Sequence, residues 1–154
     1  MRGVLKKWSA MMSGLFALSV AAIFTGAALY VNVAEQPARL LLDDRALLAE
    51  WKPSYKRGAV MQASLALIGC VLGLAASWQT SHTGFLAGAV AMVAPWPLRL
   101  LAIKPANDAL LATALDQAGP RTRALVEKWG MLHAVRTTLG ALGTLAYLWA
   151  CMTR

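Results

Sequence analysis

The chain has 154 residues, of which 58% are hydrophobic and only 14% are charged. A soluble domain of this length exposes most of its surface, so this composition excludes a soluble globular protein and indicates an integral membrane protein. The net charge of +8 fits membrane topology and contact with the lipid bilayer, and we expect no nucleic-acid partner.

Four stretches are each long and apolar enough to cross a bilayer as a helix, namely residues 9–31, 57–78, 83–103 and 130–151. The basic residues ahead of the first stretch resemble the start of a signal peptide, but the apolar run behind them is too long for one. We therefore interpret it as a retained helix. The sequence predicts an all-α fold, an integral membrane four-helix bundle that forms a single transmembrane domain over residues 1–154.

Two long connections, 32–56 and 104–128, lie on one side of this bundle, and the short connection 79–82 lies on the other. The long connections hold every acidic residue. In segments 38–51 and 107–116, apolar and charged residues alternate at helical spacing, which predicts interfacial amphipathic helices.

Charge predicts the orientation of this bundle. The side with the long connections carries eleven of the fifteen Lys and Arg residues. The positive-inside rule therefore places that side in the cytoplasm and both termini outside, in a multi-pass protein of the bacterial inner membrane. The basic cluster Arg2, Lys6 and Lys7 argues the other way.

Small residues lie one turn apart on three of the predicted helices, which lets helix backbones approach closely. We interpret them as packing surfaces: Gly69 and Gly73, Gly84 and Gly88, and Gly140 and Gly143. Trp8, Trp78 and Trp149 fall at one membrane interface and Trp51 and Trp129 at the other, as in an aromatic belt. Cys70 and Cys151 have no thiol nearby in sequence and are interpreted as packing residues.

The last predicted helix contains a histidine and an arginine. At 3.6 residues per turn, Trp129, His133 and Arg136 share one stripe with the two glycines of that helix, so the polar pair is expected to face the bundle interior. An arginine near a helix end also reaches the headgroups in some proteins, and a buried histidine is often a packing residue. The shared stripe favours a functional site.

The ends of all four helices converge around this pair and bring together Glu35, Pro37, Arg39, Tyr55, Arg57, Gln62, Arg99 and Asn107. Such a half-buried cationic pocket suits an anionic or enolisable aromatic ligand. The guanidinium of Arg136 would bind an oxyanion, Trp129 would stack on a ring, and His133 would act as a base. Glu35 either orients the imidazole or pairs with an arginine, and pairing is the favoured reading. His133 and Glu35 are too few ligands for a metal site.

Four segments of the chain resemble a known family. They contain Tyr30, Glu35, Pro37 and Arg39; Trp51, Pro53, Tyr55 and Arg57; Pro105 and Asn107; and Trp129, His133 and Arg136. This ordered set resembles the anthrone oxygenase-like family of small four-helix membrane proteins. The resemblance implies a site made of Glu35, Pro37, Trp51, Asn107, Trp129, His133 and Arg136, and an oxygenase that needs no cofactor.

The expected function is therefore a membrane-embedded monooxygenase for a hydrophobic phenolic or polyketide-like substrate. His133 would remove a proton from carbon, while Arg136 and Asn107 hold the enolate oxygen. Trp129, Glu35, Trp51, Pro37, Arg57 and Arg99 would bind the substrate. The sequence leaves open a non-enzymatic membrane protein that binds or transports a lipid or small molecule, a structural subunit, and a metal or haem redox subunit. It also leaves open a homo-oligomer.

Overall fold

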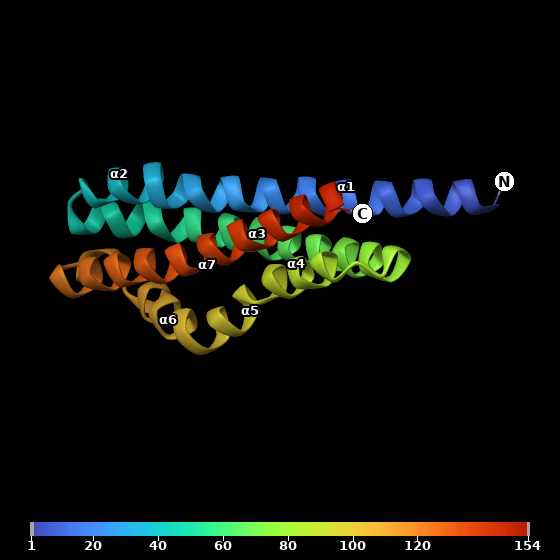
Figure 1. The fold of residues 1–154 in the computed structure, drawn as a ribbon. Coiled ribbons are helices and arrows are strands. Elements are labelled where there is room, and N and C mark those ends of the chain that lie inside the picture. The colour runs from blue at the N-terminus through green and yellow to red at the C-terminus, as the bar shows by residue number, and fades with distance from the viewer. Residues whose placement is uncertain (1, 154) are drawn as a thin grey trace.

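The computed structural model describes the backbone of residues 2–153 and the side chains of residues 8–153. Within this range it is entirely helical, and its long helices run side by side in an elongated bundle (Figure 1). The predicted all-α bundle is therefore confirmed. The side chains of four basic residues that entered the charge comparison, Arg2, Lys6, Lys7 and Arg154, lie outside the described part.

The first long helix continues well beyond the predicted span. Helix α1 (Arg2–Tyr30) passes through a π-helical segment, η1 (Val31–Glu35), directly into α2 (Gln36–Leu40). A short turn follows, and α3 (Asp44–Thr80) begins where the Asp43 carboxylate accepts hydrogen bonds from the next backbone N–H groups. The prediction of a separate interfacial helix over 38–51 is therefore wrong. Most of these residues are helical, but they form the ends of the two long helices on either side of the turn.

A tight turn leads from α3 into the third long helix. Ser81 has a left-handed backbone (φ 57°) and ends α3, and the His82 ring accepts a hydrogen bond from Gly84 N at 3.0 Å, which caps α4 (Thr83–Val93). The helix then bends through α5 (Pro95–Leu98), the π-helical η2 (Arg99–Ile103) and α6 (Lys104–Ala112). Prolines interrupt the helical hydrogen bonds along this bend, because they lack a backbone N–H.

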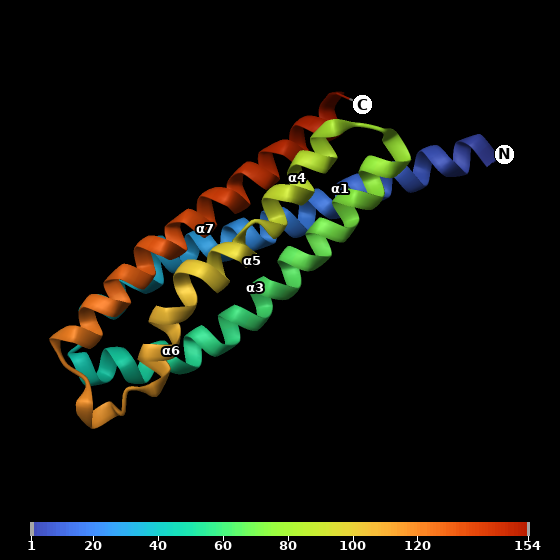
Figure 2. The same ribbon diagram turned by 90° about the horizontal axis from the view of Figure 1, so that it is seen from below.

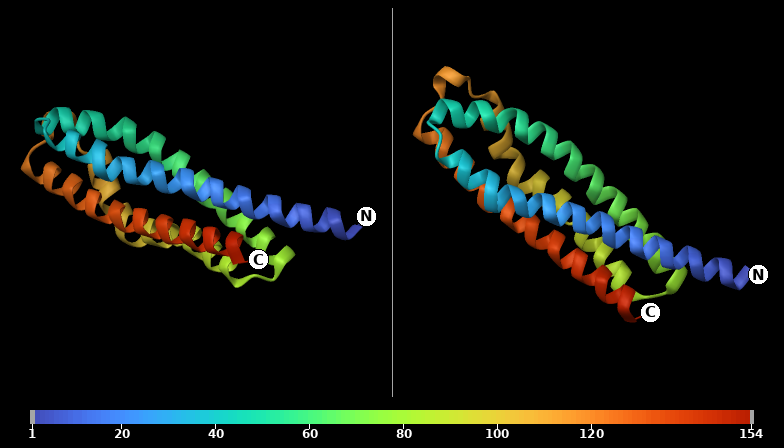
Figure 3. Two further views of the ribbon diagram at one scale, coloured as in Figure 1. Left: turned by 45° about the horizontal axis from the view of Figure 1, so that its top comes forward. Right: turned by 90° about the horizontal axis from the view of Figure 1, so that it is seen from above.

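The fourth long helix, α7 (Pro120–Thr153), follows the short 3-10 helix η3 (Leu115–Gln117). Each long helix packs against two neighbours, in the order α1, α3, α4, α7 and back to α1. Figures 2 and 3 show both chain ends and the α3–α4 turn at one end of the bundle, and the α2–α3 turn with the α6–α7 connection at the other. This arrangement of termini and connections is the predicted one. We call these the terminal end and the connection end.

Three helical stretches in the described range are long and apolar enough to cross a membrane: Trp8–Leu40, Asp44–Thr80 and Thr83–Ala112. They contain the first three predicted spans, as expected for a membrane protein. The fourth predicted span, 130–151, lies within α7. This helix has 34 residues but is not among the three. Its polar residues, Arg136 and several threonines, lower the mean hydropathy of the whole stretch.

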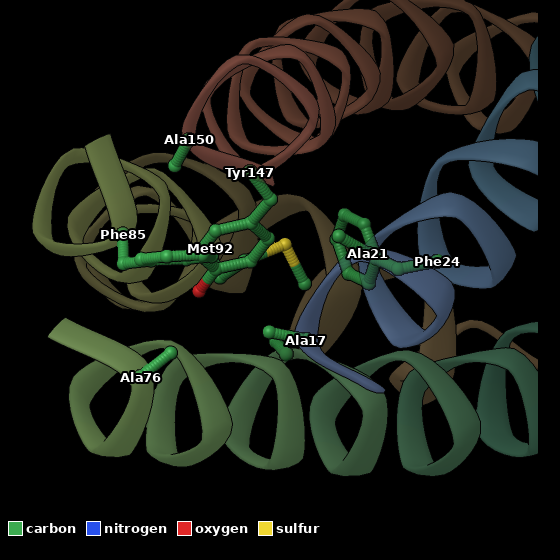
Figure 4. Packing of buried hydrophobic residues seen from close by; sticks show 9 residues of the cluster. Ala17, Ala21, Phe24, Ala76, Phe85, Met92, Tyr147 and Ala150 are labelled. Atoms are coloured by element: carbon green, nitrogen blue, oxygen red, sulfur yellow. The ribbon is translucent and has the colours of Figure 1, made fainter. Parts of the chain in front are cut away.

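At the terminal end the helices are tightly packed around a cluster of small and aromatic side chains. Figure 4 shows Phe24, Phe85, Met92 and Tyr147 projecting into the space between helices, with small alanines lining it. The Tyr147 hydroxyl donates a hydrogen bond to the Gly69 carbonyl at 2.8 Å.

Glycines make this close approach of the helices feasible. A Cβ added at Gly73 or Gly88 would overlap the Tyr147 ring, and one at Gly140 would lie 2.7 Å from Phe24. No side chain larger than hydrogen fits at these positions unless the aromatic rings move. The interpretation of the paired glycines as packing surfaces is confirmed.

At the connection end a second apolar cluster joins α3, α6 and α7. Its buried members are Leu47, Leu48, Trp51, Ile103, Leu110, Val126 and Trp129. Trp51 is completely buried and Trp129 is 7% exposed, so the assignment of these two residues to an aromatic belt is wrong. Trp8, Trp78 and Trp149 are exposed, as a belt requires. Arg123 links the ends of the long helices here, with hydrogen bonds to the Asp44 carboxylate and to the carbonyls of Leu40 and Leu42.

Candidate active site

The polar stripe of α7 faces the bundle interior. His133 is 4% exposed and Arg136 is 8% exposed, and Trp129, Gly140 and Tyr147 are buried on the same stripe. Arg136 lies over the ring of Phe24, with its Cζ atom 5.9 Å from the ring centroid. Both side chains therefore lie inside the protein, and Arg136 does not extend to the headgroups.

A cavity of about 760 Å³ lies beside this stripe, between the helices of the connection end. Pockets of this size accommodate small organic ligands. All four long helices contribute to its lining: Ala27, Tyr30, Val31 and Glu35 from the first; Glu50, Pro53, Ser54, Tyr55, Arg57, Gly58, Ala59, Met61 and Gln62 from the second; Arg99, Ile103 and Asn107 from the third; and Trp129, His133 and Arg136 from the fourth.

Both π-helical segments lie on this cavity. The η1 segment contributes Val31 and Glu35, and the η2 segment contributes Arg99 and Ile103. A π-helical turn adds a residue to the helix and redirects the side chains that follow, and such turns are frequent at functional sites. These irregularities in helix geometry were not foreseen from the sequence.

A hydrogen-bond chain fixes the orientation of His133. Its Nδ1 atom lies 2.9 Å from the Asn32 Oδ1 atom, which also accepts a hydrogen bond from the Thr137 hydroxyl at 2.6 Å. The amide nitrogen of Asn32 donates to the Gly130 carbonyl at 3.1 Å, so the amide oxygen is the atom that faces the imidazole. An amide oxygen only accepts, and the proton therefore resides on Nδ1. The lone pair of Nε2 is left for other chemistry.

Arg39 organises the acidic groups at the edge of the cavity. Its guanidinium is buried and binds the carboxylates of Glu35 and Glu50, the Gln36 side chain and the Ser54 hydroxyl. The Glu35 carboxylate therefore pairs with an arginine, as favoured from the sequence, and is not hydrogen-bonded to the imidazole. Arg39 thus fastens α2 to α3.

Three polar side chains on the cavity wall lack the partners that buried groups normally have. The Arg136 Nε, the Asn107 Oδ1 and the Gln62 Oε1 atoms are buried, and none has a hydrogen-bond partner among the described residues. An unpaired buried polar group is costly, so each is rare in a finished protein interior. Together they indicate that the wall is complementary to a polar ligand.

Aromatic side chains form the rest of the wall. Trp51 stacks on Tyr55 with parallel rings 4.8 Å apart, and it meets Trp129 edge-on at 5.8 Å. Trp129 in turn lies 5.0 Å from the His133 ring. Trp51 does not line the cavity itself, and instead holds the two aromatic rings that do. A flat apolar ligand would find two aromatic surfaces here.

The structure gathers most of the predicted site residues. His133, Arg136, Asn107, Trp129, Glu35, Arg57 and Arg99 all line the cavity. Trp51 lies one layer behind and Pro37 is exposed, and neither of them lines the cavity. Within the residues with described side chains, no three of the His, Cys, Asp and Glu residues lie close enough together to hold a metal ion.

Sequence reasoning missed the contacts of Asn32 and Gln36 and named Arg39 only as a neighbour of the site. The available signal for Asn32 was a polar amide directly after the first apolar stretch, where the helix continues in the structure, because a polar group inside a membrane helix needs a partner. Its partner, however, lies 101 residues away in the chain. Gln36 likewise bonds the Val126 carbonyl on α7, at 3.0 Å.

The model of the anthrone oxygenase family matches residues 51–146, more than half of the chain. The chain belongs to this family. It is also 31% identical to an anthrone oxygenase of Claviceps purpurea (strain 20.1) over 152 residues, which cover 88% of this chain and 82% of that protein. No solved structure matches it significantly.

The matched region contains most of the cavity wall. Asn107, Trp129, His133 and Arg136 lie inside residues 51–146, whereas Asn32 and Glu35 precede them. The family resemblance found from the sequence is therefore confirmed, together with the oxidoreductase character that the family carries.

Proposed function

We propose that this protein is a membrane-embedded monooxygenase that oxidises a hydrophobic phenolic or polyketide-like anthrone to the corresponding quinone without a cofactor. One observation carries the proposal. An imidazole with a fixed tautomer lies on a cavity wall that also holds an unpaired guanidinium and an unpaired amide. Family membership supports the same reaction class.

In this reaction a methylene carbon between two aromatic rings becomes a carbonyl carbon. Nε2 of His133 takes one proton from that carbon, and the electron pair moves onto the carbonyl oxygen to give an enolate. The electron-rich enolate reduces O₂ as a carbon–oxygen bond forms at the same carbon, and the His133 imidazolium returns its proton to the outer oxygen to give a hydroperoxide. Loss of water from the hydroperoxide leaves the new carbonyl. One O₂ molecule is consumed, with one oxygen atom retained in the quinone and the other released in water.

The remaining residues of the wall stabilise the charge that develops. The Arg136 guanidinium binds the enolate oxygen, and the amide nitrogen of Asn107 donates a second hydrogen bond to it, while Oδ1 of Asn107 accepts from a hydroxyl of the substrate. Asn32 and Thr137 hold the imidazole in the tautomer that accepts a proton at Nε2. Trp129 and Tyr55 bind the faces of the aromatic rings.

The setting of this reaction is also part of the proposal. The protein lies in the inner membrane of a bacterium, with the connection end in the cytoplasm, and its hydrophobic substrate reaches the cavity from the lipid bilayer. Fusions after residue 153 distinguish the two orientations. Alkaline phosphatase activity at that position supports the proposal, and a fluorescent cytoplasmic reporter there contradicts it.

Oxidation of 1,8-dihydroxyanthrone by the protein purified in mild detergent tests the activity. Oxygen uptake and quinone absorbance are followed together, with a metal chelator present, and heat-inactivated protein gives the background rate of autoxidation. We expect quinone to form well above this background, with one O₂ consumed per quinone. Formation at the background rate would contradict the proposal.

A second measurement separates the proposal from the other functional classes. The purified protein is examined by mass spectrometry and by its absorbance spectrum for material that co-purifies. A quinone or polyaromatic ligand supports the oxygenase. Phospholipid alone would support a lipid-binding protein, and a Soret band would support a haem redox subunit.

A further inference from the structure

The cavity carries more positive charge than its own acidic residues balance. Arg57, Arg99 and Arg136 line it, together with two acidic residues, Glu35 and Glu50. Both carboxylates bind Arg39. Among the described side chains, none of the three lining arginines forms an ion pair. The excess charge is therefore available to a bound anion.

The three arginines occupy two different depths. Arg136 is buried beside His133, whereas Arg57 on α3 and Arg99 on η2 are exposed residues at the margin of the cavity. Arg99 is still close enough to Arg136 for their charges to repel each other. A ligand with a single anionic oxygen, bound at Arg136, would therefore leave Arg57 and Arg99 without a counter-ion.

Apolar residues neighbour these two arginines in the chain. Met61, one turn after Arg57 on α3, is exposed and lines the cavity, and Val60, Leu100 and Leu101 are exposed beside it in the two segments. A ligand that lies between this margin and His133 thus has an apolar body, one oxygen at Arg136 and an anionic group at the outer end. Gln62, which is 2% exposed and unpaired, offers a further hydrogen bond to a ring hydroxyl.

We propose that the substrate is an acidic polycyclic aromatic, with a carboxylate that Arg57 and Arg99 bind at the margin of the cavity. Two planar guanidinium groups match the two oxygens of a carboxylate, and the low-polarity surroundings strengthen the pairing. The inference rests on the proposed function for the reacting end of the molecule. The carboxylate and its two arginines go beyond that function, because a neutral anthrone would leave both unpaired.

Binding of a matched pair of fluorescent ligands tests this inference. Anthracene-2-carboxylate and 2-(hydroxymethyl)anthracene have the same ring system and differ in the anionic group. Their dissociation constants are measured with the detergent-purified full chain, with Arg57→Gln, Arg99→Gln and the double variant, and with Lys56→Gln. Lys56 is an exposed neighbour on the same helix that does not line the cavity, so its variant removes the same charge without touching the site.

We expect the parent to bind the acid roughly 10- to 100-fold more tightly than the alcohol, as a charged hydrogen bond contributes. The double variant should lose this preference, and Lys56→Gln should keep it. Equal binding of acid and alcohol by the parent would overturn the proposal. An equal loss of affinity for the acid in Lys56→Gln and in the arginine variants would overturn it too, because such a loss would reflect the net charge of the protein alone. Unfolding midpoints check that each variant is folded.

Anionic lipid is the other source of an oxyanion at the margin. If phosphatidylglycerol in the micelles displaces the acid completely, and the double variant retains less of this lipid on purification, the arginines bind headgroups and the proposal is wrong. The oxidation of neutral 1,8-dihydroxyanthrone is measured on the same preparations. Tight acid binding without quinone formation would contradict the proposed function and leave this inference standing. Quinone formation without a preference for the acid would do the reverse.

Discussion

The two ends of the bundle use the same four helices in opposite ways. At the terminal end, glycines and alanines bring the helices together around Tyr147, Phe24 and Phe85, and the Tyr147 hydroxyl has its partner. At the connection end the helices surround a cavity, and buried polar groups on its wall have none. Membrane helices associate through close packing, so the terminal end holds the bundle together. The connection end is left free for chemistry.

The two histidines give the sharpest contrast between these ends. His133→Ala should lower quinone formation by roughly 10²- to 10⁴-fold, because it removes the proposed general base from the cavity. It should change the unfolding midpoint little. His82 caps α4 at the terminal end, so His82→Ala should cost about 0.5–2 kcal/mol of stability and leave turnover per folded molecule unchanged. Turnover assays and thermal unfolding of both variants make this comparison. A His133→Ala protein that oxidises the anthrone at the parental rate would break it.

Two arginines of α7 extend the contrast. Arg136→Lys keeps the charge but loses the planar fork, and we expect turnover to fall roughly 10- to 100-fold. Arg123 lies outside the cavity and ties α7 to the α2–α3 turn, so Arg123→Lys should lower the unfolding midpoint and leave turnover per folded molecule unchanged. Steady-state rates beside melting curves separate the two effects. If Arg136→Lys retained the parental rate, Arg136 would be a structural cation.

A larger side chain at a closely packed glycine tests how much the terminal end contributes to stability. Gly88→Val places a side chain where the Tyr147 ring lies, and we expect it to destabilise the protein by about 1–3 kcal/mol. Gly26 has open space around it on α1, so Gly26→Ala should be neutral or stabilise the helix slightly. Chemical unfolding in detergent measures both. An equal change in the two variants would mean that the close approach at Gly88 contributes nothing.

The smallest expected effect concerns the orientation of the imidazole. Asn32→Ala removes the acceptor of the Nδ1 proton, and we expect the turnover number to fall roughly 3- to 10-fold with little change in KM. Thr137→Ala should show a weaker effect of the same kind, because its hydroxyl donates to the same amide. Thr138 is an exposed neighbour that bonds its own helix backbone, so Thr138→Ala is the matched control. A loss confined to KM would exclude the orienting role.

Whether a feature of the site could be predicted from the sequence depends on how far apart in the chain its residues lie. The buried stripe with His133, Arg136 and Tyr147 repeats along one helix, so its period alone indicated the interior face. The bond between Asn32 and His133 joins residues far apart in sequence and depends on how α1 and α7 are placed in register. A single sequence contains no signal for that register.

The incorrect predictions have a similar origin. An interfacial helix and the end of a long transmembrane helix share the same alternation of apolar and charged residues, so segment 38–51 did not distinguish them. The buried Leu47 and Leu48 belong to α3, which starts at the Asp43 cap. Pro37 lies on the exposed side of α2, while its neighbours Gln36 and Arg39 face inward, and the sequence did not show which side of this short helix faces the cavity.

The central claim is that the cavity at the connection end binds the aromatic ring system. Irradiation of the protein with bound 9,10-anthraquinone, a photoreactive ketone that attacks nearby C–H bonds, tests it directly when the labelled peptides are mapped by mass spectrometry. We expect labels in residues 50–62 and 129–136 that disappear when excess 1,8-dihydroxyanthrone is present. Labels that lie at the terminal end, or that the excess ligand does not remove, would contradict the claim.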